Sequence, residues 1–476
     1  MIGFCILLLT CLGVTPGPGW SNPILVTDSA NTNRRVQYLH LDALGRFHLV
    51  WAGFNDDARI GYKVFSLDGT ELYPETMISR DMFSLYLSTM IMGDSLMSFW
   101  RESLPIYYAT RSLADGSEIT PATYLFTTDT LYPIIRACPD SLGRVHVLYN
   151  IGSDVIYAVW TPAPGSGFIT EYEWKIKGAD DGGVLLVDGN RVHVVVMDPV
   201  YHTYEYLQYD LEGNITIPLL DFTDNELYCS RFPELNIDSS GNLMIVESVS
   251  GASQGARFVL WKIHRNTGEV IVDEKTLVTA EIPVMDVSNH FILRHLPGTE
   301  EFYLCWTNGN WVNKVFNLLM DEDGNVLVDW HIAYDYSDEY PEDVRGIDGV
   351  VDDDGNLYIV YVQTETEPEI DYFPTFGWFN HDYLGVDGND VPISPLVSLT
   401  ASPNPSGGSV QFFFNCDDST PLRVFDINGR EVSSITVTDG TAIWNGDDFT
   451  GKRLPAGIYN IVSISGFVEQ ITLLNE

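Results

Sequence analysis

Short stretches in which apolar and polar residues alternate recur along the chain, and a tight-turn sequence precedes each of them. The clearest copies join an Asp-x-x-Gly turn to a run that ends in an aromatic residue, at 42–51 (DALGRFHLVW) and 140–149 (DSLGRVHVLY). Similar copies follow at 187–196, 238–246 and 352–361, and more degenerate ones at 94–100 and 300–306. Alternation with a period of two is typical of β-strands, and glycine supplies the positive φ that tight turns need. The pattern predicts repeated β-hairpins.

The copies are regularly spaced. Their mean interval is about 52 residues, measured between the turn positions Gly45, Asp94, Gly143, Asn190, Gly241, Glu300 and Gly355. Each copy continues into a third run and, after another turn such as Asp68-Gly69, into a fourth run. Pro74 and Pro121 in the fourth runs suit an edge strand, because proline donates no hydrogen bond to a ladder. Four strands at this period predict an all-β protein with a seven-bladed β-propeller, six blades being the alternative.

We assign the propeller to residues 22–392 and expect its ring to be closed. The segment 22–26 (NPILV) resembles the fourth-strand runs and precedes the first complete copy. We predict that it completes the last blade, so that the two ends of the propeller share one sheet. An open ring would leave the faces of its first and last blades exposed.

The N-terminus resembles a secretory leader. The stretch Ile2–Val14 is apolar, no charged side chain occurs before Asp28, and the run is shorter than the roughly 20 residues that span a bilayer. We predict a signal peptide at 1–21 and no transmembrane segment. The leader lacks a basic residue and an obvious small-x-small cleavage sequence, and Cys11 leaves a lipid anchor open as an alternative.

The charge and cysteine content of the chain bear on its partners and on disulfide bonding. The chain carries 25 basic and 66 acidic residues, a formal charge of −41, which excludes a nucleic-acid partner because such binders need a basic face. The acid excess is interpreted as a solvated surface. Four cysteines lie beyond the leader, and they are too widely spaced for a disulfide framework: Cys138, Cys229, Cys305 and Cys416. We interpret them as small buried residues.

The last part of the chain departs from the repeat. Beyond about residue 395 the sequence contains Ser402-Pro-Asn-Pro405, then 422–432 (LRVFDINGREV), Trp444-Asn-Gly-Asp447 and 451–459 (GKRLPAGIY). The turn within 422–432 separates two strand-like runs, and a further alternating run starts at Gly457. These runs predict a small β-sandwich at 393–476 with Trp444 in its core.

The same motifs resemble the C-terminal sorting domain of substrates of the type IX (Por) secretion system. That domain is similar to the immunoglobulin-like domain of flagellar hook-capping proteins, and the resemblance covers roughly the last 75 residues. It implies an immunoglobulin-like sandwich, export across a Gram-negative outer membrane, and recognition by the outer-membrane secretion machinery. A secreted or bacterial cell-surface location follows from the resemblance. An immunoglobulin-like module that only packs or adheres is the alternative.

Five arginines form a candidate ligand-binding set. Arg35, Arg231 and Arg345 each lie ten residues before a turn position, and Arg136 and Arg294 lie seven and six before theirs. In a propeller these offsets fall near the start of the innermost strand, by the mouth of the central channel. A ring of guanidinium groups there would bind a carboxylate-bearing glycan through bidentate contacts. Two considerations oppose this: each arginine could pair with an acid at a blade junction, and offsets of ten and seven have opposite parity.

Metal and cofactor sites are not predicted. His48, His146 and His193 share one repeat position but belong to different blades, too far apart for one metal ion, so we interpret them as packing residues. The acidic turns 321–325 and 352–356 offer oxygen ligands, but Ile332 and Gln363 stand where an EF-hand has its last carboxylate. Hairpin turns are the favoured interpretation, with structural calcium as the alternative.

The repeat spacing resembles that of the BNR or sialidase-like propellers. The chain lacks a good copy of the family's Ser-x-Asp-x-Gly-x-Thr-Trp box and its Phe-Arg-Ile-Pro motif, so we assign no catalytic residue. The favoured function is a non-catalytic exported propeller that binds an extracellular glycan or protein. A secreted exo-glycosidase is the second hypothesis, and a structural component of a surface layer is the third.

Overall fold

The structure is a computed structural model of the chain. It describes residues 15–17, 19–21, 23–26, 33–54, 59–67, 69–79, 84–128, 135–152, 154–163, 167–178, 183–197, 203–223, 228–229, 233–251, 255–278, 291–307, 314–335, 344–365, 371–379, 399–402, 409–414, 422–426, 430–436, 441–462 and 468–474. Every regular element in these residues is a β-strand. The described part of the chain contains no helix long and apolar enough to cross a membrane. It divides into two units: the larger contains Thr15, Pro16 and Ser21–Phe379, and the smaller contains Gly17–Trp20 and the residues after Phe379.

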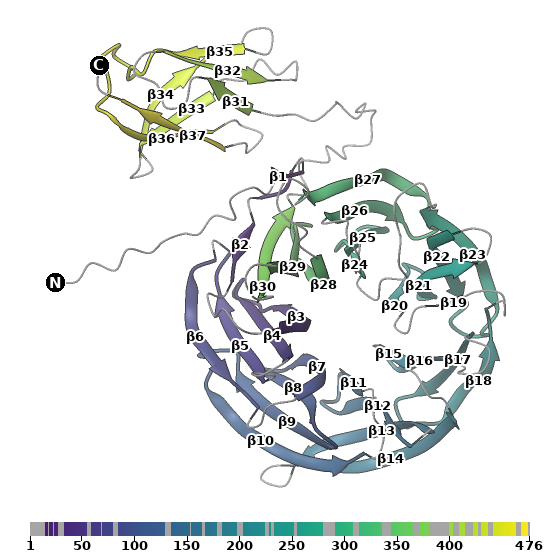
Figure 1. Cartoon of the computed structure of the whole chain (residues 1–476). Coiled ribbons are helices and arrows are strands. Elements are labelled where there is room, and N and C mark those ends of the chain that lie inside the picture. Colours follow the sequence, from purple (N-terminus) through teal and green to yellow (C-terminus); the bar gives the residue numbers. More distant parts are fainter. Residues whose placement is uncertain are drawn as a thin grey trace. The chain divides into compact units, whose positions relative to one another are not determined.

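The larger unit is a propeller of seven antiparallel blades arranged around one axis (Figure 1). We number the blades 1 to 7 along the chain. In that order, the innermost strands are β3 (Asn33–Leu41), β7 (Ser84–Met92), β11 (Ile135–Pro139), β15 (Gly183–Asp188), β20 (Glu234–Ile237), β24 (Phe291–His295) and β28 (Val344–Val351). The second strands are β4 (Phe47–Phe54), β8 (Ser95–Glu102), β12 (Val145–Ile151), β16 (Arg191–Met197), β21 (Leu243–Gly251), β25 (Glu301–Thr307) and β29 (Leu357–Glu365). This order confirms the predicted propeller with seven blades.

The two outer strands complete each blade. The third strands are β5 (Ile60–Phe65), β9 (Pro105–Ser112), β13 (Asp154–Ala163), β17 (Tyr204–Asp210), β22 (Gly255–Ile263), β26 (Lys314–Asp321) and β30 (Asp371–Phe379). The outermost are β6 (Glu71–Met77), β10 (Glu118–Thr127), β14 (Gly167–Gly178), β18 (Ile215–Asp221), β23 (Val270–Val278), β27 (Val326–Asp335) and β2 (Ile24–Leu25). Two short strands add to this scheme: β1 (Thr15–Pro16) pairs with β27, and β19 (Tyr228–Cys229) pairs with β21.

The inner turns explain why the repeat motif is only partly regular. In blades 1, 3, 5 and 7 the aspartate carboxylate accepts backbone N–H groups two to four residues ahead, as Asp42 does from Leu44 and Arg46. Blades 2 and 4 instead use two-residue hairpins, in which Gly93 and Gly189 have positive φ. The turn glycine of these blades therefore lies one residue before the position predicted from the sequence.

The N-terminal strand closes the ring, as predicted. Ile24 pairs with Phe376 of β30, so the seventh blade contains strands from both ends of the propeller. The seam between blades 7 and 1 is also polar: Gln37 donates from Nε2 to the carbonyl oxygens of Gly346 and Val360, at 3.2 and 2.9 Å. Both the pairing of β2 with β30 and the hydrogen bonds of Gln37 hold the first and last blades together.

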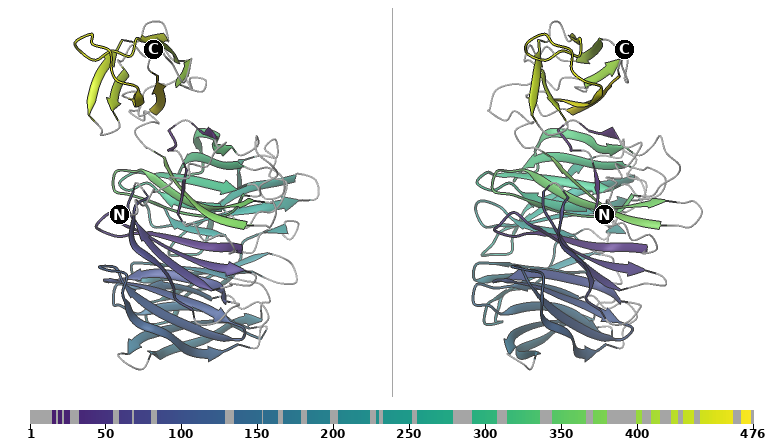
Figure 2. Two further views of the ribbon diagram at one scale, coloured as in Figure 1. Left: turned by 60° about the vertical axis from the view of Figure 1, so that its left-hand side comes forward. Right: turned by 90° about the vertical axis from the view of Figure 1, so that its left-hand side faces the viewer.

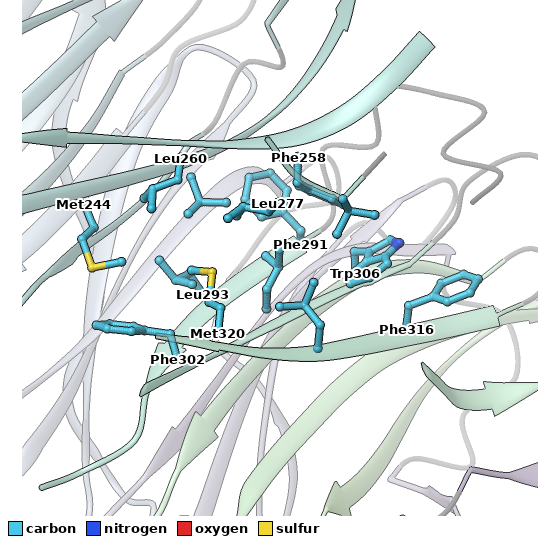
Figure 3. Packing of buried hydrophobic residues seen from close by; sticks show 14 residues of the cluster. Met244, Phe258, Leu260, Leu277, Phe291, Leu293, Phe302, Trp306, Phe316 and Met320 are labelled. Carbon is cyan, nitrogen blue, oxygen red and sulfur yellow. The ribbon is translucent and has the colours of Figure 1, made fainter. Parts of the chain in front are cut away.

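Apolar side chains fill the seams between neighbouring blades. Figure 3 shows the seam between blades 5 and 6, where Phe258 lies between Phe291 and Trp306 with ring centroids 5.2 Å from each. Trp306 stacks in turn on Phe316, at 5.3 Å. Burial of one such side chain stabilises the fold by about 1.5–3 kcal/mol. Neighbouring blades therefore depend on each other for their cores, and the side views in Figure 2 show their strands lying alongside one another.

The outer edges of the blades are irregular. In the six blades with a full-length outermost strand, the pairing of that strand with the third strand is interrupted by register shifts. The pairing of second and third strands runs without a shift in all seven blades. Bulges twist an edge strand away from foreign strands, so the rim is protected against edge-to-edge aggregation.

The smaller unit is a two-sheet β-sandwich, the class predicted for the C-terminal segment. One sheet has the order β31 (Leu399–Ser402), β32 (Val410–Phe414), β35 (Thr441–Trp444), and the other β34 (Glu431–Ile435), β33 (Leu422–Asp426), β36 (Gly457–Val462), β37 (Val468–Leu473). Their facing side chains form one apolar core. Trp444 is 3 % exposed and meets the Tyr459 ring edge to face at 5.4 Å, which confirms its predicted core position.

Gly61 offers a test of the packing in blade 1. It pairs with Trp51 on the neighbouring strand, and a Cβ atom at Gly61 would lie 2.2 Å from the indole ring. Because the buried ring has no room to move, we expect Gly61→Ala to lower the free energy of unfolding by about 1–3 kcal/mol. Urea denaturation followed by tryptophan fluorescence measures this. Gly457→Ala is the matched control, because its Cβ would be 3.9 Å from the nearest side chain. Equal stability of both variants would contradict the packing.

Candidate functional site at the propeller axis

Five polar side chains lie near the axis of the ring, four of them charged and close enough to the fifth, Tyr38, to influence its pKa, and we call them the axial cluster. Four of them occupy the same position in the repeat, seven residues before the turn glycine: Tyr38, Arg136, Glu234 and Asp348. Each pairs across the innermost hairpin with the residue that stands five positions after the turn glycine. The fifth, Arg294, comes from β24. The equal register of the innermost strands places one residue from each of blades 1, 3, 5 and 7 at the same level. The cluster is therefore a product of the repeat.

Arg294 is the centre of the cluster. Its Nη1 lies 2.8 Å from Glu234 Oε2 and its Nη2 lies 2.5 Å from Asp348 Oδ1, so one guanidinium joins carboxylates of the two neighbouring blades. Nε donates to the Gly349 carbonyl oxygen at 2.6 Å. Asp348 also accepts the backbone N–H of Leu39 at 2.8 Å through Oδ2. Blades 5, 6, 7 and 1 are linked through this one arginine.

The cluster is enclosed but reachable by solvent. The side chains of Arg294, Glu234 and Asp348 are 27 %, 28 % and 11 % exposed. Burial raises the pKa of Glu234 and of Asp348, and repulsion by Asp348 adds to the increase at Glu234, although Arg294 opposes the increase at both carboxylates. Burial alone would lower the pKa of Arg294, but the two carboxylates raise it, so the guanidinium stays charged. Burial also raises the pKa of Tyr38, which lies in the field of all four charged groups.

A cavity of about 540 Å³ lies at the turn end of the innermost strands, between blades 1 and 7. His40, two residues beyond Tyr38 on β3, lines it together with Asp42 and Asp352–Asp354. The ring of His40 is 2.6 Å from Thr89 Oγ1 through Nε2. Burial is the main cause that lowers the pKa of His40 to about 3, so this imidazole is neutral at pH 7. Polar groups therefore continue from the axial cluster toward the turn face.

The structure places two of the five predicted arginines, Arg136 and Arg294, within electrostatic range of Tyr38. Arg294 pairs with acidic residues of the two neighbouring blades. This is the arrangement that the sequence analysis gave as the alternative to ligand binding for all five arginines. Arg231 lies outside the described residues. Arg35 and Arg345 lie on β3 and β28, but their side chains are not among those described. A register shift follows both Arg34 and Arg345, so the parity argument for regular strands does not apply there.

Sequence reasoning missed Tyr38, Glu234 and Asp348. A signal was present, because each stands seven residues before its turn glycine, as Arg136 does. The offsets of the arginines alone do not reveal this shared position. The cluster combines different residue types at one repeat position, and only the closed ring shows that they face a common centre.

The three aligned histidines belong to structural hydrogen-bond networks. His48 Nδ1 lies 2.9 Å from the Tyr62 hydroxyl, and its Nε2 lies 3.1 Å from Asp42 Oδ2. His146 repeats this geometry with Tyr157 and Asp140, at 2.7 and 3.2 Å. Although the order resembles a catalytic triad, both imidazoles are 0 % exposed. Their predicted role as packing residues is confirmed.

Blade 4 keeps the histidine and loses its acid. His193 Nδ1 lies 2.9 Å from the Tyr206 hydroxyl, but the two-residue turn supplies no aspartate, and Nε2 has no hydrogen-bond partner among the described residues. Burial is the main cause that lowers the pKa of His193 to about 4. By contrast, burial alone would raise the pKa of Asp42, but hydrogen bonds from Arg46 and His48 help to lower it to about 2.

The acidic turns considered for calcium are hairpin turns. Asp321 Oδ1 accepts the backbone N–H groups of Asp323 and Asn325, at 3.0 and 2.7 Å, and Asp352 repeats this with Asp354 and Asn356. Within the described residues, no three His, Cys, Asp or Glu side chains are grouped so as to hold a metal ion.

Comparison with known proteins supports the fold. No family model matches the sequence, and no curated protein is significantly similar to it. A fungal alcohol oxidase of the AA5 family, solved in complex with copper, is 10 % identical over 96 % of this chain and 99 % of its own, with a TM-score of 0.51. At this identity the similarity concerns the fold alone.

Two further structures are more distant. PorZ, a surface component of the type-IX secretion system of Porphyromonas gingivalis, is 11 % identical over 92 % of this chain, with a TM-score of 0.41. The match spans 59 % of the length of PorZ. The BP39L lectin from Burkholderia pseudomallei is 10 % identical over 70 % of this chain and 96 % of its own, with a TM-score of 0.44.

The buried histidines predict acid sensitivity. An unfolded histidine takes up a proton below about pH 6.5, whereas folded His193 does so only near pH 4, so the protein loses stability as the pH falls through this window. The loss assigned to His193 is about 3 kcal/mol between pH 7 and 4. Urea denaturation across this range measures it. We expect His193→Asn to lose correspondingly less stability than the unsubstituted protein. His264→Asn, on an exposed turn, is the control, and parallel pH profiles for all three proteins would contradict the assignment.

Proposed function

We propose that the protein is an exported, non-catalytic propeller that binds an extracellular glycan at its axial cluster. The observation that carries the proposal is the Arg294 network, because it gathers donors and acceptors from several blades where solvent still reaches them. A cluster needed only to hold the blades together would gain more from apolar side chains, since buried ion pairs contribute little net stability. The protein retains charged groups at the point where all blades converge.

The charge of the cluster selects the ligand. Arg294 is already neutralised by Glu234 and Asp348, so an anionic ligand would meet two carboxylates near the guanidinium. A sugar hydroxyl can donate to a carboxylate and accept from an arginine or tyrosine, so an uncharged glycan satisfies both kinds of group. We therefore replace the carboxylate-bearing ligand expected from the arginines with a neutral, hydroxyl-rich one.

We infer export from the ends of the chain. The apolar leader supports entry into a secretory route, and the C-terminal motifs resemble a type IX sorting domain on a unit that is a β-sandwich. Under this proposal the sandwich is recognised by outer-membrane secretion machinery, and the propeller acts outside the cell or on its surface. A protein ligand in place of a glycan remains the alternative for the binding face.

A glycan array tests the binding function. We expect the protein to retain neutral oligosaccharides in preference to uronate or sialate conjugates, at low and at moderate salt. Tyr38→Phe removes one hydroxyl and Arg136→Gln removes one charge from the cluster without leaving Arg294 unpaired. Loss of one hydrogen bond to an uncharged or charged partner costs about 0.5–3 kcal/mol, so the dissociation constant of the best glycan should rise roughly 2- to 150-fold.

The matched control for these variants is Arg191→Gln. Arg191 lies on β16 and donates to Asn266 at an exposed site, so the same change of charge there should leave binding unaltered. Equal affinity of all variants would refute binding at the axial cluster. Absence of any glycan ligand at both salt concentrations would favour the protein ligand or the structural surface role.

A glycosidase is the second candidate, and one observation favours it. Glu234 and Asp348 bind the two ends of one guanidinium, which brings the two carboxyl groups close together, and glycosidases use such a pair. Both have raised pKa values, as a general acid requires. Our proposal expects no hydrolysis in a screen of fluorogenic glycosides between pH 4 and 7. Hydrolysis that is lost in both Glu234→Gln and Asp348→Asn would establish the glycosidase instead.

A further inference from the structure

Two parts of the N-terminal segment that follows the apolar leader, Thr15–Pro16 and Ser21–Val26, belong to the same unit as the propeller blades. Thr15 and Pro16 form β1 and pair with Asp335 and Tyr334 at the outer edge of blade 6. Ile24 and Leu25 form β2 and pair with β30 of blade 7. Figure 1 shows β1 beside β27 and β2 beside β30. The segment thus attaches to two neighbouring blades.

Ser21 is bonded into the space between these two strand pairs. Its backbone N–H donates to the Trp378 carbonyl oxygen at 2.9 Å, and its hydroxyl accepts the Trp378 backbone N–H at 3.1 Å. Its carbonyl oxygen accepts the Tyr334 hydroxyl at 3.1 Å, and Tyr334 is 0 % exposed. Removal of Ser21 would cost the buried Tyr334 hydroxyl this hydrogen bond, and the loss of a buried hydrogen bond is destabilising.

The end of the segment reaches the first blade. Lys63 of β5 donates through Nζ to the Val26 carbonyl oxygen at 2.5 Å, and the Val26 side chain, 5 % exposed, belongs to the core shared by blades 7 and 1. Ile24 lies against the turn of blade 1, where a Cβ on Gly69 would be 2.7 Å from it. Contacts of the segment therefore run from blade 6 through blade 7 to blade 1.

We propose that the leader is removed N-terminal to Thr15 and that the mature protein retains Thr15–Val26 as a strap across three blades. This rests on the proposed export and moves the leader boundary from residue 21 to before residue 15. The step is hydrolysis of one peptide bond by a leader peptidase: water adds across the C–N bond and leaves a carboxyl and an amino terminus, with no redox change. Although the leader has no obvious small-x-small sequence, Cys11 and Gly13 come nearest to that pattern and would place the cleavage after Gly13.

The N-terminal residue of the protein recovered from outside the producing cells tests this. Intact mass and N-terminal sequencing should give a first residue between Cys11 and Thr15. A lipid-modified Cys11 also retains the strap and supports the proposal. A first residue at Pro16 or later would refute the strap but would leave the proposed export unaffected. An exported chain that still starts at Met1 would refute the proposed removal of the leader. A chain found only inside the cells refutes the proposed export itself.

Two shortened chains test the strap independently of export. We expect a protein of residues 15–476 to have the same melting temperature as the full chain. A protein of residues 22–476 should melt at least about 3 °C below the 15–476 protein. Ser21→Ala in the longer chain should lower the melting temperature by a smaller amount because it removes one hydrogen-bond acceptor. Ser239→Ala, at an exposed turn, is the matched control. Identical melting temperatures for the two shortened chains would overturn the strap.

Discussion

Closure of the ring is the constraint on which the rest of the structure depends. The axial cluster takes one side chain from each of five blades, and these side chains meet only if the first and last blades adjoin. Pairing of β2 with β30 supplies the backbone part of that closure, and Gln37 and Asp348 supply polar bonds across the same seam. A propeller without this seam would keep most of its apolar cores, but Asp348 would no longer be fixed relative to blade 1. Stability and the proposed binding function are therefore coupled at the junction of blades 7 and 1.

Much of the fold was predictable from the sequence because the signal is repeated. The Asp-x-x-Gly turn and the alternating run after it occur in clear form in blades 1, 3, 5 and 7, which fixes their strands and their period. The turn glycines of the copies around Asp94 and Asn190 were predicted one residue too late. Their two-residue hairpins place the glycine at the first turn position, whereas the Asp-x-x-Gly turns place it at the end of the tetrapeptide. Closure was predictable as well, since a fourth-strand run stands ahead of the first complete repeat.

The site was less predictable, for a physical reason. Sequence periodicity gives the level of a residue along its strand, but it does not give which side chains meet across the axis. Arg136 was found through its charge and its offset, while Tyr38, Glu234 and Asp348 share that offset and differ in chemistry. The partners of Arg294 lie 54 and 60 residues away in the chain, on different blades. Such pairing depends on the assembled ring, and it changes the expected ligand from an anionic to a neutral one.

The most direct test of the account is a crystal structure of the full chain soaked with a neutral oligosaccharide. The account predicts sugar density at the axis, with hydroxyl groups in hydrogen-bond contact with Tyr38 and with the carboxylates that flank Arg294. Sugar bound only at the outer rim, or an axis at which Arg294 does not contact Glu234 and Asp348, would contradict it.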